Sequence, residues 1–312
     1  MVGHIKNLTM ARNTFQDVVL PLLCEDSIKV IQWFQQNKIM KSEVKCDSCT
    51  NWMNWTKFSR SKDGFVWKCQ FKQCQKYKST KSIRVGSFFA RSNISLQKWL
   101  HVMYLWCERI GETAAGRQVN ISEKTMIDFY SFFREVCTAY FQTNPIQLGG
   151  PGITVEIDES CFSHKPKHHR GRVSETPIWV FGMVDKSQSP AVGYMEIVER
   201  RDAATLLPII QQVVRPGSVI HSDEWRAYRN IQGLGYAHRT VNHSVNFVDP
   251  SSGVHTQTIE SYWNKQKNHI KTMRGCKRSF LNSYLHEFMW HDRFCKNALQ
   301  SLCETIAAQY PL

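Results

Sequence analysis

Three acidic residues in the second half of the chain have the types and spacing of a divalent-metal site for phosphoryl chemistry. Asp158 lies inside a stretch that predicts a strand, Asp223 directly follows another, and Glu260 lies in the first turns of a predicted helix. A carboxylate within a strand is costly unless it has a partner or a cation, and carboxylate oxygens are ligands that Mg²⁺ prefers. Two such ions, about 3.5–4 Å apart, activate an attacking hydroxyl and stabilise a leaving oxygen. Lys267 follows Glu260 by two helical turns on the same face, where it could contact a phosphate.

Other carboxylates compete for the same roles, and the residues alone do not choose among them. Asp185 is interpreted as a turn residue and Asp202 as a helix cap. The competing acids are Glu156, Glu159, Asp185, Asp202 and Glu224.

Four of the 11 cysteines form a second constellation. Cys46 and Cys49 are separated by two residues, and Cys69 and Cys74 by four, with 19 residues between the pairs. Two pairs on tight turns joined by a hairpin are typical of a tetrahedral zinc site, which can fold a segment too small for its own core. We predict one structural Zn²⁺; unpaired thiols in a small core are the alternative.

A third group combines Cys161 with His164, His168 and His169 in a loop rich in His, Lys and Arg, 161–172. The spacing of these four residues contains no ordered pairs of metal ligands. We interpret it as a mobile or DNA-facing loop rather than a metal site, and its role stays open.

The charge of the chain favours a polyanionic partner. Lysine and arginine total 40 against 26 acidic residues in 312, a formal net charge of +14. Residues 38–98 hold 14 basic and 3 acidic residues, interleaved with tryptophan, phenylalanine and tyrosine. This pattern is typical of nucleic-acid-binding surfaces, although a solvated basic face would have a similar composition. We expect no membrane span and no secretory signal, because no long apolar run exists.

The elements that must position these residues divide into two halves. Before the segment 144–152, rich in Pro and Gly, helices are predicted over 25–38, 95–110, 113–120 and 122–141, the last three in the outline of a helix-turn-helix or of an ordinary connector. After it, strands are predicted over 153–162, 178–184, 191–198, 218–221 and 238–242. Helices are expected over 203–214, 224–230, 256–272 and 279–308. This alternation indicates an α/β domain with a mixed sheet.

The stretches EIDES, HSDEWRAY and VNHSVNFVDPSSGVHTQTIESYWNKQK together resemble the DDE transposase domain of the Merlin superfamily, which bacterial insertion-sequence transposases share. The resemblance covers roughly 152–295. It implies an RNase H-like fold, a cut-and-paste mechanism with two Mg²⁺ (or Mn²⁺) per active site, and triad roles for Asp158, Asp223 and Glu260. It assigns Lys267 the role of the lysine that follows the triad.

The resemblance also implies an organisation and a set of partners. We expect an N-terminal helical segment (1–40), a zinc-ribbon-like module (41–92), a helix-turn-helix-like segment (93–144) and the RNase H-like domain (150–312). The partners would be double-stranded DNA, as terminal inverted repeats and target, and a second copy of the chain in a homodimer or higher oligomer. The location would be nuclear in a eukaryote, or otherwise cytoplasmic with the nucleoid. A catalytically silent DNA-binding protein and a hydrolytic RNase H-like nuclease are the alternatives.

Overall fold

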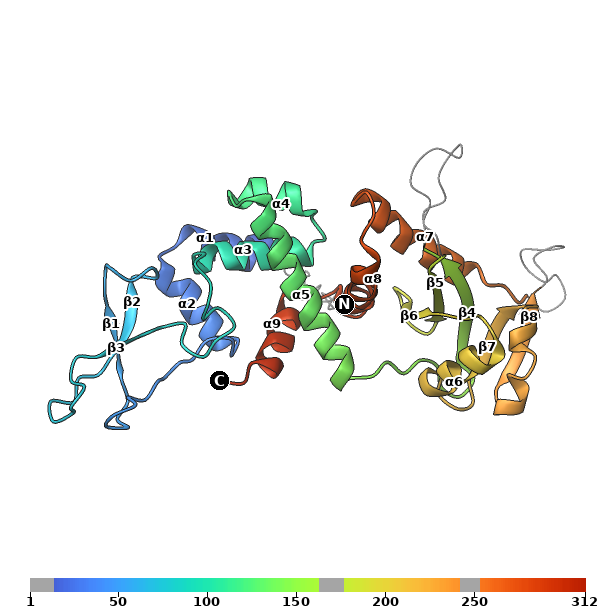
Figure 1. Cartoon of the computed structure of the whole chain (residues 1–312), viewed down its shortest axis with the longest axis horizontal. Helices are drawn as coiled ribbons and strands as arrows, with labels where there is room; N and C mark the ends of the chain where they lie inside the picture. The colour runs from blue at the N-terminus through green and yellow to red at the C-terminus, as the bar shows by residue number, and fades with distance from the viewer. Residues whose placement is uncertain (1–13, 163–176, 242–252) are drawn as a thin grey trace, which may run out of the picture. The chain divides into compact units, whose positions relative to one another are not determined.

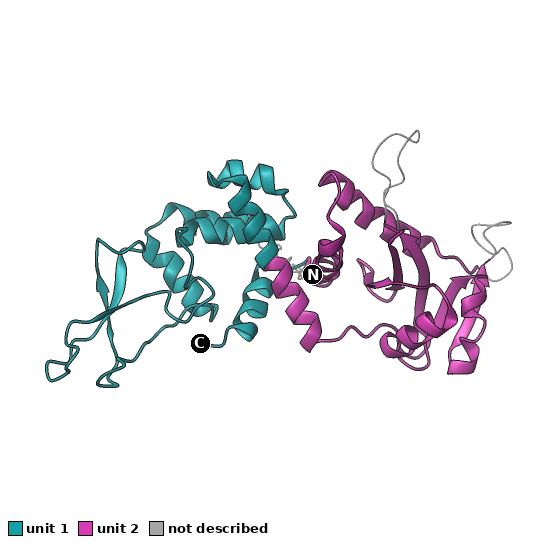
Figure 2. Cartoon of the chain, viewed as in Figure 1, with its two compact units in different colours: residues 1–132, 296–312 teal, residues 133–295 magenta. Residues whose placement is uncertain are grey.

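The computed structural model describes residues 14–162, 177–241 and 253–312. The chain forms two compact units, shown in different colours in Figure 2. Unit 1 holds residues 1–132 and 296–312, and unit 2 holds residues 133–295.

Unit 1 opens with short helical pieces followed by a small sheet (Figure 1). The helical pieces are η1 (Phe15–Val19), α1 (Leu20–Cys24) and α2 (Ser27–Gln36). The strands are β1 (Asn54–Lys57), β2 (Phe65–Lys68) and β3 (Thr80–Ser82), antiparallel in the order β1-β2-β3. Helix α2 fulfils the prediction over 25–38 because its apolar residues Val30, Ile31 and Phe34 fall on one face and are all buried.

Three helices follow the small sheet. Helix α3 (Leu96–Cys107) begins where the Ser95 hydroxyl accepts the Lys98 backbone N–H. Helix α4 (Glu112–Val119) ends at Asn120, which has a left-handed backbone. Helix α5 (Glu123–Thr143) begins where Ser122 Oγ accepts the Thr125 N–H. Side-chain oxygens at these positions satisfy backbone donors that a helix start leaves free.

Unit 2 is built on a five-stranded sheet. Its strands are β4 (Thr154–Cys161), β5 (Trp179–Asp185), β6 (Val192–Val198), β7 (Val219–Asp223) and β8 (Ala237–Val241). They lie in the order β6-β5-β4-β7-β8, with β4 antiparallel to β5 and parallel to β7. This mixed sheet confirms the predicted RNase H-like α/β class.

Helix α6 (Ala203–Val213) connects β6 to β7, and its start is capped by Asp202, whose carboxylate accepts the Thr205 N–H. Pro208 lies inside this helix, which nevertheless runs to Val213. The predicted helix over 224–230 is reduced to one 3-10 turn, η3 (Arg226–Tyr228), and a second turn, η4 (Gln232–Leu234), follows.

Helix α7 (Gln257–Thr272) packs closely against the sheet at two glycines. A Cβ on Gly182 of β5 would overlap the Trp263 indole, and a Cβ on Gly193 of β6 would overlap the Tyr262 ring. Both aromatic residues are buried in the core of unit 2. The absence of side chains at these two strand positions therefore permits the close approach of α7.

The last two helices belong to different units. Helix α8 (Arg278–Phe294) packs on β6 in unit 2, whereas α9 (Ala298–Gln309) belongs to unit 1 and packs on α3. The predicted catalytic domain over 150–312 thus differs from the compact unit, which begins within α5 and ends before α9. The buried Leu302, Cys303 and Ile306 account for the attachment of α9. Among the described helices, none is both long and apolar enough for a membrane span.

Candidate active site and metal centre

Asp158 and Asp223 lie on neighbouring parallel strands. The register pairs Thr154 with Val219 and Glu156 with His221, so Asp158 and Asp223 fall at corresponding positions two residues further on. Carboxyl ends of parallel strands meet at one edge of a sheet, and the structure brings these two predicted acids to that edge.

The third predicted acid, Glu260, lies on helix α7. Its Trp263 indole donates a hydrogen bond to Oδ2 of Asp158, at 3.0 Å. Glu260 stands three positions before Trp263, on the same side of the helix. The charges of Asp223 and Glu260 both act on Asp158, so the three acids lie in one neighbourhood.

The surroundings of Asp158 raise the pKa of its carboxyl group. Burial, which disfavours a charged carboxylate, raises the pKa of Asp158 to about 6, with smaller contributions from Asp223 and Glu260, against the lowering hydrogen bond from Trp263. A bound cation would favour the ionised form and reverse that effect. The repulsion among these neighbouring carboxylates is a cost that a divalent cation would remove.

Glu156, a competing acid, has a different place. Its side chain is 0% exposed, and its Oε2 accepts the backbone N–H of Ile259 in the first turn of α7, at 3.0 Å. Its Oε1 accepts the Thr258 hydroxyl at 3.1 Å and pairs with Lys186 Nζ at 3.0 Å. The His255 Nδ1 lies 3.4 Å from the same oxygen. A carboxylate at a helix start accepts hydrogen bonds from free N–H groups, and the positive end of the helix dipole stabilises its charge. Glu156 thus fixes the start of the helix that carries Glu260.

Glu159, another competing acid, lies next to Asp158 but is held from a different direction. The Tyr228 hydroxyl donates a hydrogen bond to its Oε1, and Arg201 Nη1 lies 4.0 Å from its Oε2. Burial raises the pKa of Glu159 to about 7, against the lowering effect of the Tyr228 hydrogen bond, while the charges of Asp158 and Asp223 raise it further. Glu159, one of the competing acids in the sequence, is therefore a fourth carboxylate close to the predicted three.

Lys267 lies on the same side of α7 as Trp263 and Glu260. Burial lowers its pKa, and the charges of Cys161 and Asp158 oppose that lowering. Its Nζ lies 5.4 Å from the centre of the Phe162 ring. The structure therefore brings this predicted lysine beside the acids.

The remaining competing acids have ordinary structural surroundings. Asp185 accepts the N–H groups of Gly149 and Ser187, both at 2.7 Å, which agrees with its interpretation as a turn residue. Glu224 is exposed. Of the third constellation, only Cys161 is described; His164, His168 and His169 lie outside the described residues.

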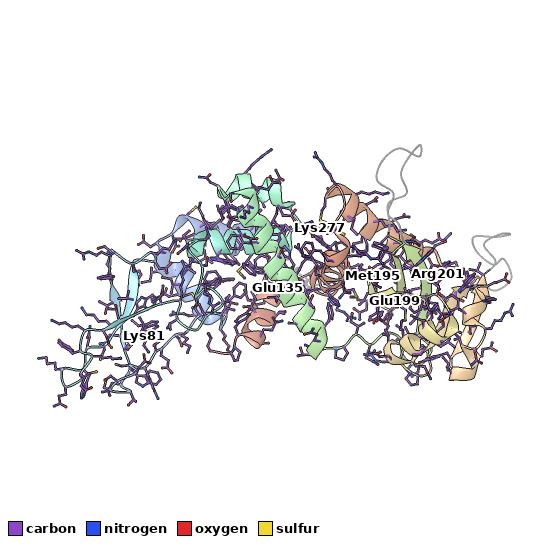
Figure 3. The ribbon with its side chains drawn as sticks, viewed as in Figure 1. Lys81, Glu135, Met195, Glu199, Arg201 and Lys277 are labelled. Carbon is purple, nitrogen blue, oxygen red and sulfur yellow. The ribbon has the colours of Figure 1, made fainter. Side chains whose placement is uncertain are left out.

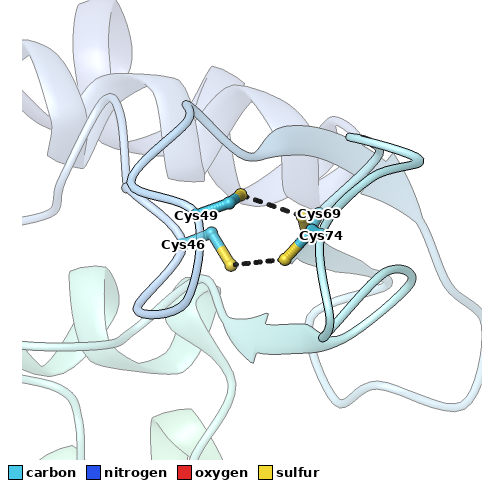
Figure 4. A group of neighbouring side chains, drawn as sticks. All are labelled: Cys46, Cys49, Cys69 and Cys74. Carbon is cyan, nitrogen blue, oxygen red and sulfur yellow. Dashed lines mark hydrogen bonds between the residues drawn. The ribbon is translucent and has the colours of Figure 1, made fainter.

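The four predicted zinc ligands lie together in unit 1 (Figure 4). Cys46 and Cys74 have their sulfur atoms 3.8 Å apart, as do Cys49 and Cys69. Zn–S bonds of about 2.3 Å in a tetrahedron require S···S edges of about 3.8 Å. Within the described ranges, this is the only group of three or more potential ligand residues whose ligand atoms all lie within 4.8 Å of one another. The cluster is compatible with a structural zinc ion, whereas the three carboxylates form a looser group.

The backbone around Cys46 favours the thiolate form that metals require, whereas burial and the neighbouring cysteines raise the pKa of Cys69. The N–H groups of Cys49 and Ser48 donate to the Cys46 sulfur and lower its pKa to about 6. The short spacing of the first pair produces this turn, in which backbone donors face the first sulfur.

Comparisons with known proteins found a family model and two curated relatives. A family model described as an ISXO2-like transposase domain matches residues 147–292. An uncharacterised transposase-like protein of Haemophilus influenzae is 31% identical over 108 residues, which cover 35% of this chain and 85% of that protein. Male abnormal protein mab-31 of Caenorhabditis elegans is 26% identical over 175 residues, which cover 51% of this chain and 39% of that protein.

Solved structures with some likeness include chains of two complexes. A chain of the simian T-cell lymphotropic virus intasome in complex with PP2A regulatory subunit B56 gamma has 16% identity and a TM-score of 0.30, with 61% of this chain and 66% of that chain covered. A chain of the Mos1 strand transfer complex has 11% identity and a TM-score of 0.20, with 64% and 76% covered. Likenesses as weak as these establish neither a shared mechanism nor a shared partner.

The position of Glu156 generates a stability prediction. Glu156→Gln keeps the size of the side chain but removes the charge that faces Lys186 and the start of α7. We expect the free energy of unfolding to fall by about 2 kcal/mol, because a buried pair and a helix cap are both weakened. Urea denaturation measures this change. Glu199→Gln, which alters an exposed acid of the same unit, should change it by less than about 0.5 kcal/mol; equal effects of the two variants would contradict the capping role.

The raised pKa of Asp158 generates a pH prediction. A carboxyl whose pKa is higher in the folded than in the unfolded protein takes up protons on folding. Its contribution to stability is therefore present below about pH 4 and lost as the pH rises through about 6. Asp158→Asn imitates the neutral form at every pH. Without added divalent metal, the free energy of unfolding of the parent minus that of this variant should fall between pH 4.5 and pH 7.5, in steps of roughly half a unit. A difference that rises over this range would contradict the burial argument.

Proposed function

The chain belongs to the ISXO2-like transposase family, and from this premise we propose that it is a DNA transposase that cleaves the ends of a mobile element and joins them to target DNA. The resemblance to transposases predicted from the sequence is confirmed by that membership. The observation that carries the mechanistic proposal is the hydrogen bond from Trp263 to Asp158, which joins the helix of Glu260 to the strand of the first acid.

In the proposed mechanism, Asp158, Asp223 and Glu260 hold two divalent cations, Mg²⁺ or Mn²⁺. Bound cations of this kind supply Lewis-acid stabilisation of the attacking and leaving oxygens. Trp263 fixes the orientation of the Asp158 carboxylate by donating to Oδ2. Lys267, on the same side of α7, contacts a phosphate of the DNA without holding the cations. Hydrolysis and strand joining are both displacements at phosphorus, so one set of residues serves both steps.

The proposed DNA-end recognition belongs mainly to the residues before Asn144. Exposed aromatic side chains with a neighbouring lysine support this proposal. Trp52 is 53% exposed, with Lys45 Nζ 4.6 Å from its ring centre, and Lys78 Nζ lies 5.3 Å from the ring of the exposed Tyr77. Stacking rings and phosphate-binding cations are the groups that nucleic acids contact. The active form would be a homodimer or higher oligomer on DNA, acting in a nucleus or on a nucleoid.

We expect each of the three acids to be needed for chemistry. Replacing Asp158, Asp223 or Glu260 with Ala should lower single-turnover cleavage of labelled element ends in Mg²⁺ or Mn²⁺ by about 100-fold or more, because a metal ligand is lost. Asn or Gln at these positions should fail similarly, because the charge is lost. Lys267→Ala should have a smaller effect.

The matched control is Glu199→Ala, which removes an exposed acid of the same unit. Binding to element ends, measured in parallel, should be unchanged in all these variants. Cleavage at the parent rate by all three alanine variants would overturn the metal-site proposal. Cleavage without joining of the 3′-OH to target DNA would favour the nuclease alternative.

We also expect about one zinc ion per chain. Cys69→Ser should lower the zinc content measured by atomic emission and destabilise the β1–β3 sheet, because the ion replaces a core that this small sheet lacks. Cys295→Ser, which changes an exposed cysteine, is the control. Full zinc occupancy in a variant with both Cys46→Ser and Cys69→Ser would contradict the assignment.

A further inference from the structure

An arginine-rich groove opens at the start of α6 and along η3, within unit 2. Its volume is about 630 Å³. Four arginines and one aspartate line it together with an exposed tryptophan: Arg200, Arg201, Arg226, Arg229, Asp202 and Trp225. Figure 3 labels Arg201 among the side chains of this unit. The groove is far larger than a single phosphate requires and is strongly cationic.

Two of the arginines are available to a ligand. Arg200 Nε is paired with Asp202 Oδ2 at 2.8 Å. Arg226 and Arg229 are exposed, and neither guanidinium forms an ion pair with another described residue. Guanidinium groups bind phosphate oxygens through paired N–H donors, so this groove is built for a phosphorylated ligand.

Trp225 gives the groove a second kind of contact. The side chain is 39% exposed, yet its indole N–H donates to the Arg201 carbonyl at 3.1 Å. The Arg201 guanidinium lies 5.4 Å from the Trp225 ring centre and 3.6 Å from that of Trp179. The exposed ring is therefore held in place before any ligand arrives, as a stacking platform requires.

The groove adjoins the acids of the proposed active site. The Trp225 backbone N–H donates to Oδ1 of Asp223 at 3.0 Å, and Arg201 approaches Glu159 within 4.0 Å. A strand with one phosphate at the acids would have its neighbouring nucleotides within reach of the groove.

We propose that this groove binds an unpaired stretch of a DNA strand beside the active site, with Trp225 stacked on a base and Arg226 and Arg229 on the flanking phosphates. A base in a duplex presents only its edge, so the stacking contact selects single-stranded nucleotides. This inference deepens the proposed transposase function and rests on it.

The test uses the full chain without added divalent metal, so that binding is measured without cleavage. The probe is a DNA duplex with a four-nucleotide single-stranded extension carrying 5-iodouracil, compared with a blunt duplex of the same sequence. Photocrosslinking followed by mass spectrometry of peptides should identify Trp225 as a crosslinked residue with the extended probe. Fluorescence anisotropy should show Trp225→Ala binding the extended probe about tenfold more weakly and the blunt duplex unchanged. Trp225→Phe should retain most of the affinity.

The arginines have a separate readout. The double variant Arg226→Ala/Arg229→Ala should reduce the slope of log affinity against log salt by about 1.4 for the extended probe, because each lost single-strand phosphate contact removes about 0.7. Phe280→Ala and Lys277→Ala change an exposed aromatic and an exposed cation of the same unit outside the groove and should leave both readouts unchanged. The arginine variants keep the proposal testable if Trp225→Ala does not fold.

Three outcomes would overturn the proposal that this groove binds single-stranded DNA. These are parent-like binding by both the tryptophan and the arginine variants, a crosslink confined to unit 1, and a mononucleotide that competes with the extended probe as well as single-stranded DNA does at the same nucleotide concentration. Metal-dependent cleavage that survives such a result would leave the transposase function standing. Conversely, a confirmed groove in a chain whose Asp158→Ala variant cleaves normally would overturn the proposed mechanism alone.

Discussion

The docking of α7 on the central sheet is the constraint on which the candidate site depends. The helix brings Glu260 and Lys267 to strands that carry the other acids, and it does so through a fully buried carboxylate, Glu156, at its first turn. The same strand, two residues further, receives the Trp263 indole on Asp158. A helix start and an indole N–H both need acceptors when buried. Strand β4 supplies both acceptors from one face, so the position of α7 along the strand is fixed by hydrogen bonds as well as by packing.

These hydrogen bonds require α7 to approach the sheet closely, and two glycines make this approach possible because they have no side chains. Gly182 and Gly193 leave room on β5 and β6 for the rings of two adjacent α7 residues. Large aromatic rings in a well-packed core fix an interface more sharply than small aliphatic side chains, because they tolerate little displacement. Pre-organised carboxylates are useful for phosphoryl chemistry only when they are held in such a frame. The raised pKa values of Asp158 and Glu159 result mainly from burial of the two carboxyl groups in that frame, and the charges of neighbouring acids raise them further.

The two units are stabilised in different ways. Unit 2 buries an extensive apolar cluster on its sheet, whereas the small sheet of unit 1 has three strands of three or four residues. Short strands bury little apolar surface, and the cluster of four cysteines is compatible with a structural zinc ion, which would compensate for this. The polar surfaces that remain exposed in both units combine arginine or lysine with aromatic rings, which is consistent with contact to nucleic acid at more than one place.

Spacing along the chain determined the features that depend on neighbouring residues. The pairs around Cys46 and Cys69 predicted a four-sulfur cluster, and Asp202 was interpreted as a helix cap, because these geometries are local. The sheet and its acids were predicted from strand patterns and a family resemblance. The resemblance favoured Asp158 over Glu156, which periodicity could not do because both acids lie on one strand face. The tertiary structure showed that the two acids meet different parts of α7. It also decided the attachment of α9 to unit 1, the shortening of the predicted helix after Asp223, and the meeting of four arginines with Trp225. These depend on contacts between distant segments, which no local pattern of residues encodes.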